Sequence, residues 1–220
     1  MKLSTISGTI FLLRSITMGK WDSNKKQKLE ALLNTGFELF QSQGINKTSI
    51  ADIAEKAGVA KGTFYLYFKD KYDLRNRLIA HKSSQLFEMA YKALEASDID
   101  RNLEDDLIFI VDYILDYLNN NKPLLTFMYK DLSWGVFKKA LTETTIDDED
   151  INFNYLYNLM VQNAKAEIHD PEIMLFLIIE LVGATAYSSI IYKDPIDLDK
   201  LKPHLYNTIR NIIKEYTIHD

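Results

Sequence analysis

The stretch SIADIAEKAGVAKGTFYLYFKDK, residues 49–71, has the organisation of two short helices joined by a glycine-containing turn. Ser49 and Asp52 have the spacing of an N-terminal capping box, with Asp in place of Glu. Gly58 interrupts the first helix, and a second short helix is expected over residues 61–66. This pattern predicts a helix-turn-helix unit, whose second helix usually lies in the major groove of DNA.

The amino end of the second helix carries the side chains expected to approach base edges. Lys61, Gly62 and Thr63 stand there, combining a cation, a position of close backbone approach and a short hydroxyl. Phe64 and Phe68 are one helical turn apart and are expected in the core instead.

Other residues of the stretch are placed to meet phosphates, which position a protein on DNA without reading its sequence. Tyr65 and Tyr67 carry hydroxyls on long rigid rings, and Lys71 adds a cation in the first turn of the next helix. Thr48 and Ser49 stand at the amino end of the preceding helix, where free N–H groups favour an anion.

Helical periodicity continues through the rest of the chain, without alternating strand patterns. We expect an all-α fold: an N-terminal helix-turn-helix domain over residues 21–70 and a larger helical domain over residues 71–220. A long helix over about 70–96, capped by Asp70, connects them. The other expected helices cover residues 24–43 (ended by Gly44), 101–121, a short helix from Pro123, 148–168, 171–192 (with Asp170 as N-cap) and 203–216 (begun by Pro203).

Residues 1–20 are left out of this fold prediction. They resemble a secretory signal, but Arg14 interrupts the apolar run and no cleavage site follows. We interpret them as an extension that is disordered or precedes a true start at Met18, and we predict that residues 1–17 are dispensable.

Charge is distributed unevenly along the chain, whose net charge is −5. Residues 1–19 carry +2, residues 20–82 carry 12 basic and 7 acidic side chains (+5), and residues 83–220 carry 12 and 24 (−12). A basic region joined to an acidic one favours a polyanionic partner for the first.

Composition excludes several chemistries. The chain has no cysteine, which rules out disulfides, cysteine nucleophiles and thiolate metal sites, and fits a reducing cytoplasm. None of its 4 histidines is i, i+4 from another, so we expect no metal site and no cofactor. Residues 173–191 carry one charge, Glu180; this favours a core helix buried on two sides, with a membrane span as the alternative.

At this point the sequence resembles a known family. TSIADIAEKAGVAKGTFYLYFKDKYDL, residues 48–74, is similar to the DNA-binding domain of the tetracycline-repressor (TetR) family of bacterial transcription regulators, and the resemblance extends over residues 25–78. It implies DNA contacts at Thr48, Ser49, Lys61, Gly62, Thr63, Tyr65, Tyr67 and Lys71. It also implies a larger domain that binds a ligand and dimerises through its last two long helices. Ala60 departs from the family, which commonly has Ser there, and Leu66 stands where some members have a polar or aromatic contact residue.

Three functions are compatible with these features. The first is a repressor that binds a palindromic operator as a homodimer and is released by a small apolar or aromatic effector. The second is a DNA-binding regulator controlled by a protein partner. The third, a helical enzyme, is disfavoured because the acidic runs LEDDL and IDDEDIN are explained by favourable charge at helix starts.

The larger domain supplies candidate residues for the two remaining sites. Aromatic and methionine side chains suit an apolar pocket, and the candidates are Phe109, Tyr113, Tyr117, Phe127, Met128, Trp134, Phe137 and Tyr155. The helix over 172–192 is apolar on more than one face and rich in small residues, and with residues 203–216 it is the expected two-fold interface. The dimer candidates are Leu177, Glu180, Leu181, Ala184, Ser188, Ile209 and Ile213.

Overall fold

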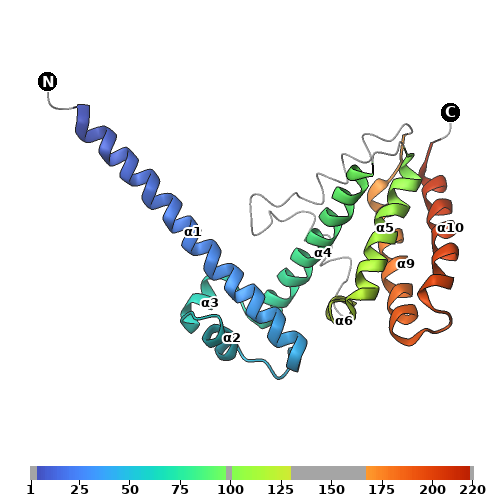
Figure 1. Ribbon diagram of the computed structural model, residues 1–220, viewed down its shortest axis with the longest axis horizontal. Coiled ribbons are helices and arrows are strands. Elements are labelled where there is room, and N and C mark those ends of the chain that lie inside the picture. Colours follow the sequence, from blue (N-terminus) through green and yellow to red (C-terminus); the bar gives the residue numbers. More distant parts are fainter. Residues whose placement is uncertain (1–3, 98–100, 130–166, 219–220) are drawn as a thin grey trace. The chain divides into compact units, whose positions relative to one another are not determined.

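The computed structural model describes residues 4–97, 101–129 and 167–218, with side chains from residue 24 onward. Every element named in these ranges is helical, which confirms the predicted all-α fold (Figure 1). The elements are α1 (Ser4–Gln43), α2 (Ile50–Lys56), α3 (Lys61–Tyr67), α4 (Lys71–Ala96), α5 (Leu103–Asn120), α6 (Lys122–Tyr129), α9 (Pro171–Tyr187), the π-helical turn η1 (Ser188–Tyr192) and α10 (Leu198–Tyr216).

The chain divides into two compact units, residues 1–75 and 76–220, and the division falls within α4. Unit 1 contains α1, α2, α3 and the first residues of α4. Its buried side chains come from all four helices: Leu32, Leu33, Phe40, Ile53, Ala54, Phe64, Phe68 and Leu74. Gly36 of α1 makes close packing possible, because a Cβ atom there would lie 2.6 Å from Cδ2 of Leu74.

The start of α1 differs from the prediction. The helix begins at Ser4 rather than near residue 24, so the predicted start was wrong. No proline occurs in residues 4–23, and therefore nothing removes the backbone donors that a helix needs. Translation from Met18 and the dispensability of residues 1–17 stay predictions.

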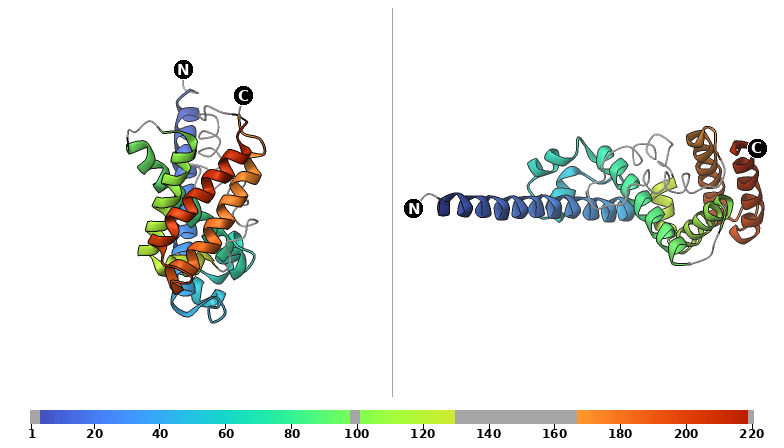
Figure 2. Two further views of the ribbon diagram at one scale, coloured as in Figure 1. Left: turned by 90° about the vertical axis from the view of Figure 1, so that its right-hand side faces the viewer. Right: turned by 90° about the horizontal axis from the view of Figure 1, so that it is seen from above.

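Unit 2 is built around one hydrophobic core, to which α4, α5, α6, α9 and α10 contribute. Helix α10 packs against both α5 and α9, and α6 packs against the same two helices (Figures 1 and 2). Fully buried side chains at the centre include Leu115, Met174 and Ile209, one from each of α5, α9 and α10.

A polar bridge joins α5 to α10 at the edge of this core. Lys202 Nζ lies 2.6 Å from Asp112 and 2.5 Å from Asp116, and the Tyr206 hydroxyl donates to Asp112. Burial lowers the pKa of Lys202, but hydrogen bonds and the charges of the two aspartates outweigh it, so the net shift is upward. Burial, and then the bond to Asp112, raises the pKa of Tyr206.

The helix boundaries in unit 2 follow their caps. Asp170 is the N-cap of α9 and Pro171 its first residue, as predicted, although Asp170 has φ 46° and makes no side-chain capping bond. The predicted start of the last helix at Pro203 was wrong, because Asp197 caps α10 by accepting from the Lys200 N–H at 3.1 Å. Pro203 lies inside the helix, where the packing of α10 outweighs one missing hydrogen bond.

The predicted helix over 148–168 falls mostly outside the described residues. At its end, Ile168 forms an isolated antiparallel bridge with Thr217 instead of a helical turn. Among the described helices, one is long and apolar enough to cross a membrane by length and composition, the segment Pro171–Tyr192. Met174, Leu175 and Ile178 of this segment are buried in the core of unit 2, as a core helix requires.

Candidate nucleic-acid interface and interior cavity

Local interactions determine the geometry of α2, the turn and α3. The Ser49 hydroxyl accepts from the Asp52 N–H at 3.1 Å, and Asp52 accepts from the Ser49 N–H at 2.9 Å, which confirms the capping box. These bonds lower the pKa of Asp52. Gly58 has φ +69°, a conformation that favours glycine, and Val59 N–H bonds to Ala54 O at 2.9 Å.

Helix α3 has a buried side and an exposed side. Phe64 and Phe68 are buried, with ring centroids 5.4 Å apart, so their assignment to the core is confirmed. Lys61 and Gly62 are exposed, and Tyr65 and Leu66 keep 53% and 81% of their surface accessible. A leucine so exposed on a seven-residue helix has no packing role in the described part of unit 1.

Thr48 and Lys71 differ from their predicted roles. Thr48 is 1% exposed, and its hydroxyl donates to Gly44 O at 2.9 Å, which leaves no side-chain surface for a phosphate. Lys71 Nζ donates to Ile45 O at 2.8 Å and to Thr48 O at 2.9 Å. Both side chains satisfy backbone carbonyls between α1 and α2 that no helix satisfies, and they hold the amino end of α2 in place.

The remaining predicted contacts are accessible to differing extents. Ser49 is exposed, and Thr63 is half-buried. Tyr67 is half-buried, and its hydroxyl donates to Lys25 O at 3.2 Å, which joins α3 to α1. The side chains of Lys25 and Lys69 are exposed and add positive charge to unit 1.

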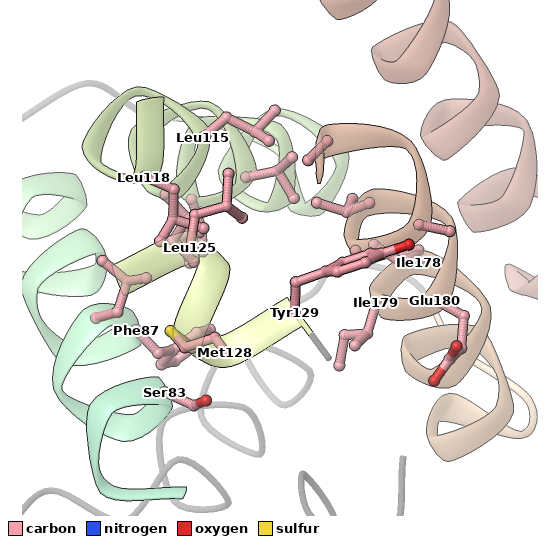
Figure 3. Close-up of a pocket in the computed structure, with 18 of the residues that line it drawn as sticks. Ser83, Phe87, Leu115, Leu118, Leu125, Met128, Tyr129, Ile178, Ile179 and Glu180 are labelled. Atoms are coloured by element: carbon pink, nitrogen blue, oxygen red, sulfur yellow. The ribbon is translucent and has the colours of Figure 1, made fainter. Parts of the chain in front are cut away.

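Unit 2 contains a cavity of about 570 Å³, within the usual range for small-molecule sites (Figure 3). Its lining is almost entirely aliphatic and aromatic and comes from α4, α5, α6 and α9. The lining residues are Ser83, Leu86, Phe87, Leu107, Ile110, Val111, Ile114, Leu115, Leu118, Leu125, Met128, Tyr129, Leu175, Ile178, Ile179, Glu180, Val182, Gly183, Ala184 and Ala186.

Aromatic rings connect the cavity to the π-helical turn. Tyr129, in the lining, stacks on Tyr187 with centroids 3.6 Å apart and ring planes 5° from parallel. Tyr192, in η1, meets Tyr187 edge-on at 5.7 Å. A hydrogen bond with Tyr192 raises the pKa of Tyr187. The end of α6 and the end of α9 are therefore joined beside the cavity.

Of the predicted pocket residues, Met128 lines the cavity. Phe109, Tyr113, Tyr117 and Phe127 do not line this cavity, and their assignment to a ligand pocket stays a prediction. The cavity side of α5 carries Ile110, Ile114 and Leu118 among others, whereas Phe109, Tyr113 and Tyr117 form a separate i, i+4 row. Trp134, Phe137 and Tyr155 lie outside the described residues.

The predicted dimer residues also separate into two groups. Ile209 and Ile213 are 0% and 1% exposed within their own unit, so their assignment to a dimer surface was wrong: α10 turns its apolar face to α5 and α9. On α9, Glu180, Ala184 and Leu177 are exposed. Leu181 and Ser188 are half-buried, and Ile173, one turn from Leu177, is 49% exposed.

A helix-turn-helix unit joined to an all-helical unit with an apolar cavity defines a two-unit class of DNA-binding protein. Residues 32–78 match the family model described as bacterial regulatory proteins, tetR family. The amino-terminal region of the chain is therefore similar to the DNA-binding domain of the tetR family.

Curated relatives match mainly the amino-terminal region. The chain is 41% identical over 63 residues to an uncharacterized HTH-type transcriptional regulator of Bacillus subtilis, YvdT, covering 27% of this chain and 32% of that protein. It is 33% identical over 96 residues to the HTH-type transcriptional regulator AcrR of Shigella flexneri, covering 40% and 45%. The matches thus span less than half the length of these two relatives.

Solved structures share the fold across both units. The Thermus thermophilus FadR, a TetR-family transcriptional repressor in complex with lauroyl-CoA, has a TM-score of 0.57 and 20% identity, covering 87% of this chain and 96% of that chain. The Bacillus subtilis FadR in complex with stearoyl-CoA has a TM-score of 0.55 and 19% identity, covering 86% and 99%.

Proposed function

We propose that this protein is a transcriptional repressor that binds a palindromic operator as a homodimer and is released by a small-molecule effector. The observation that carries the proposal is the exposed side of α3, where Lys61, Gly62, Tyr65 and Leu66 stand free of the core. A short helix that presents a cation, a glycine and exposed side chains after a helix-turn is suited to the major groove.

Residues on α3 divide between base reading and backbone contact. Lys61 and Thr63, at its amino end, read base edges. Leu66 was missing from the sequence-based candidates, although its placement after Tyr65 on a short helix was a usable signal. Its apolar side chain suits the methyl group of thymine.

Phosphate contacts come from Ser49, Tyr65 and Tyr67, with Lys25 and Lys69 adding long-range attraction. Thr48 and Lys71 act by holding the loop between α1 and α2, because their polar atoms bond to carbonyls there. They are positioning residues for the amino end of α2.

Dimerisation supplies the second copy of α3 that a palindrome requires. The exposed row on α9, with Ile173, Leu177, Glu180 and Ala184, is the surface that we assign to the two-fold contact. Replacing Leu177 by Glu is expected to give monomers in sedimentation experiments at micromolar concentration, because the contact would bury a charge.

The effector occupies the cavity of unit 2. Two structural neighbours are described as complexes with lauroyl-CoA and stearoyl-CoA, and this supports an effector with an extended apolar part. The aliphatic lining here suits such a part. Control by a protein partner is the second candidate, favoured only if the cavity accepts no small molecule. The protein acts in the cytoplasm and is not an enzyme under this proposal.

The test begins with selection of binding sites from a random DNA pool, followed by titration of the preferred duplex and a scrambled duplex at several salt concentrations. We expect a palindrome, and Lys61→Ala or Thr63→Ala should cost about 1–3 kcal/mol and relax preference at one position in each half-site. Equal affinity for the selected and scrambled duplexes would refute sequence-specific binding.

A further inference from the structure

We propose that Leu66 reads the C5-methyl group of a pyrimidine in the operator, so that one position of each half-site is selected without a hydrogen bond. Thymine presents this methyl group in the major groove, and 5-methylcytosine presents the same group. The inference rests on the proposed function of α3 and names the chemical group that one part of its surface recognises.

Leu66 points away from the core of unit 1. Phe64 is 0% exposed and Phe68 is 1% exposed, so these two rings mark the inner side of α3, whereas Leu66 keeps 81% of its surface accessible. A step of two residues turns about 200° around a helix axis, and Leu66 is two residues from each ring. Leu66 therefore stands opposite the buried side, on the part of α3 that would enter a groove furthest.

Gly62 lies one helical turn before Leu66 and leaves the approach to it open. A Cβ atom at Gly62 would meet no described atom within 4 Å outside its own helix. Gly62 and Leu66 together form an outer strip of α3 that carries no side-chain donor or acceptor. This outer strip can come close to a base edge, but its side chains contact the base only through apolar surface.

Hydroxyl groups lie on either side of the outer strip. Tyr65 and Tyr67 are each about 100° around the helix from Leu66, in opposite directions. The Tyr65 ring is 53% exposed, and the Tyr67 hydroxyl donates to Lys25 O at 3.2 Å. Both tyrosines are assigned above to phosphates, which form the walls of the groove, so the strip between them faces the base edges.

Thymine is the natural base whose edge matches an apolar side chain. Its C5-methyl group is apolar, whereas the other groups that distinguish the bases in the major groove are hydrogen-bond donors and acceptors. A leucine that covered a donor or acceptor would displace water from it without replacing the hydrogen bond, which costs free energy. Contact between Leu66 and a methyl group instead removes apolar surface of both partners from water.

The experiment removes the methyl group without changing base pairing. In the palindrome selected from the random pool, each thymine is replaced in turn by deoxyuridine in both half-sites, and the full chain is titrated with each duplex. We expect one position at which the replacement weakens binding by about fourfold per half-site, the effect of one buried methyl or methylene group. At that position, 5-methylcytosine should bind more tightly than cytosine for the same reason.

Variants assign the methyl preference to Leu66. Leu66→Ala should fold like the parent chain, because the side chain is exposed, and should bind the thymine and deoxyuridine duplexes with equal affinity. It should also lose the difference between 5-methylcytosine and cytosine. Tyr65→Phe is the matched control on the same helix: it loses a hydroxyl assigned to phosphate, so it should weaken binding to every duplex and retain the methyl preference.

The proposed function and this inference fail in different ways. Equal affinity of the parent chain for the selected and scrambled duplexes would refute both. A retained preference for the selected duplex, with no thymine position sensitive to loss of the methyl group, would refute the role of Leu66 alone. A methyl preference that persists unchanged in Leu66→Ala would also refute it, because another group would then read the methyl.

Discussion

Unit 1 and unit 2 use their buried residues in opposite ways. In unit 1, Phe64, Phe68 and Leu74 are buried in the core that α1, α2, α3 and the start of α4 form, and α3 turns its other side to solvent. In unit 2, long helices enclose a core that still leaves about 570 Å³ open. A small unit that presents a rigid surface requires complete packing, whereas a unit that receives a ligand requires incomplete packing.

The largest expected effect comes from opening the core of unit 1. Phe64→Ala removes a side chain with 0% exposure and should destabilise unit 1 by about 3–5 kcal/mol. DNA binding should be lost while unit 2 keeps its helical signal and its own unfolding transition, as measured by DNA titration and circular dichroism. Tyr72→Ala is the matched control, because its ring is 47% exposed, no DNA contact is assigned to it, and it contributes less than about 0.5 kcal/mol to folding. Loss of the helical signal of both units in Phe64→Ala would mean that the units do not fold independently.

Lys71→Met tests whether Lys71 positions α2 or contacts DNA directly. The substitution keeps an apolar stem but removes the Lys71 donor from the carbonyls of Ile45 and Thr48, of which the Ile45 carbonyl keeps the Thr48 N–H at 3.3 Å, so it should cost about 1–3 kcal/mol of stability. DNA affinity should fall with little change in its salt dependence. The sequence-based prediction for Lys71 was a phosphate contact. If Lys71 made that contact, the slope of DNA affinity against salt concentration should fall by about 1 in the variant. Lys69→Met, at an exposed lysine, is the control for charge alone.

The same substitution at two helical glycines sharpens the contrast in packing. Gly36→Ala places a Cβ atom 2.6 Å from Cδ2 of the buried Leu74, and overpacking of about 1–3 kcal/mol should exceed the helix-propensity gain of about 1 kcal/mol. Gly183→Ala in α9 meets no described atom within 4 Å and should stabilise unit 2 by about 0.5–1 kcal/mol.

Thermal and denaturant unfolding of both variants measure these shifts. Leu74→Ala combined with Gly36→Ala should show coupling, because the smaller side chain relieves the clash. Destabilisation by Gly183→Ala, or stabilisation by Gly36→Ala, would contradict the difference in packing drawn between the units.

The smallest expected effects are changes of the free energy of unfolding with pH. They occur at acid pH for unit 1 and at alkaline pH for unit 2. The folded-state pKa of Asp52 lies below 3.8, so its contribution is present above 3.8 and is lost as pH falls through the lowered value. The folded-state pKa of Lys202 lies above 10.5, so its contribution is present below 10.5 and is lost as pH rises through the raised value.

Unfolding free energies of Asp52→Asn and Lys202→Met, compared with the parent chain across pH, test this. The Asp52→Asn difference should vanish toward acid and the Lys202→Met difference toward alkali. A difference that is independent of pH in either variant would exclude the corresponding charge interaction.

Local signals were predicted well because neighbouring residues generate them. The Ser49–Asp52 capping box and the breaks at Gly44 and Gly58 depend on backbone groups a few residues away. The α1 start was missed because no proline in residues 4–23 interrupts the helix, and the Pro203 boundary was missed because Asp197 caps α10 upstream of it. Gly36 carried no recognisable signal, since its role depends on Leu74, which lies far away in the sequence.

By itself, the sequence determined the all-α class, the helix-turn-helix and the buried and exposed sides of α3, because turn chemistry and helical periodicity are local properties. Tertiary structure alone decided which apolar faces enclose space. The helical spacing of Ile209 and Ile213 is the spacing that a dimer surface would also have. The spacing of Tyr113 and Tyr117 is likewise the spacing that a pocket wall would have. Only the packing of α5, α9 and α10 placed the isoleucines inside, and only the arrangement of α4, α5, α6 and α9 formed the cavity. Periodicity gives a helix its apolar face, but the partner that covers this face comes from elsewhere in the chain.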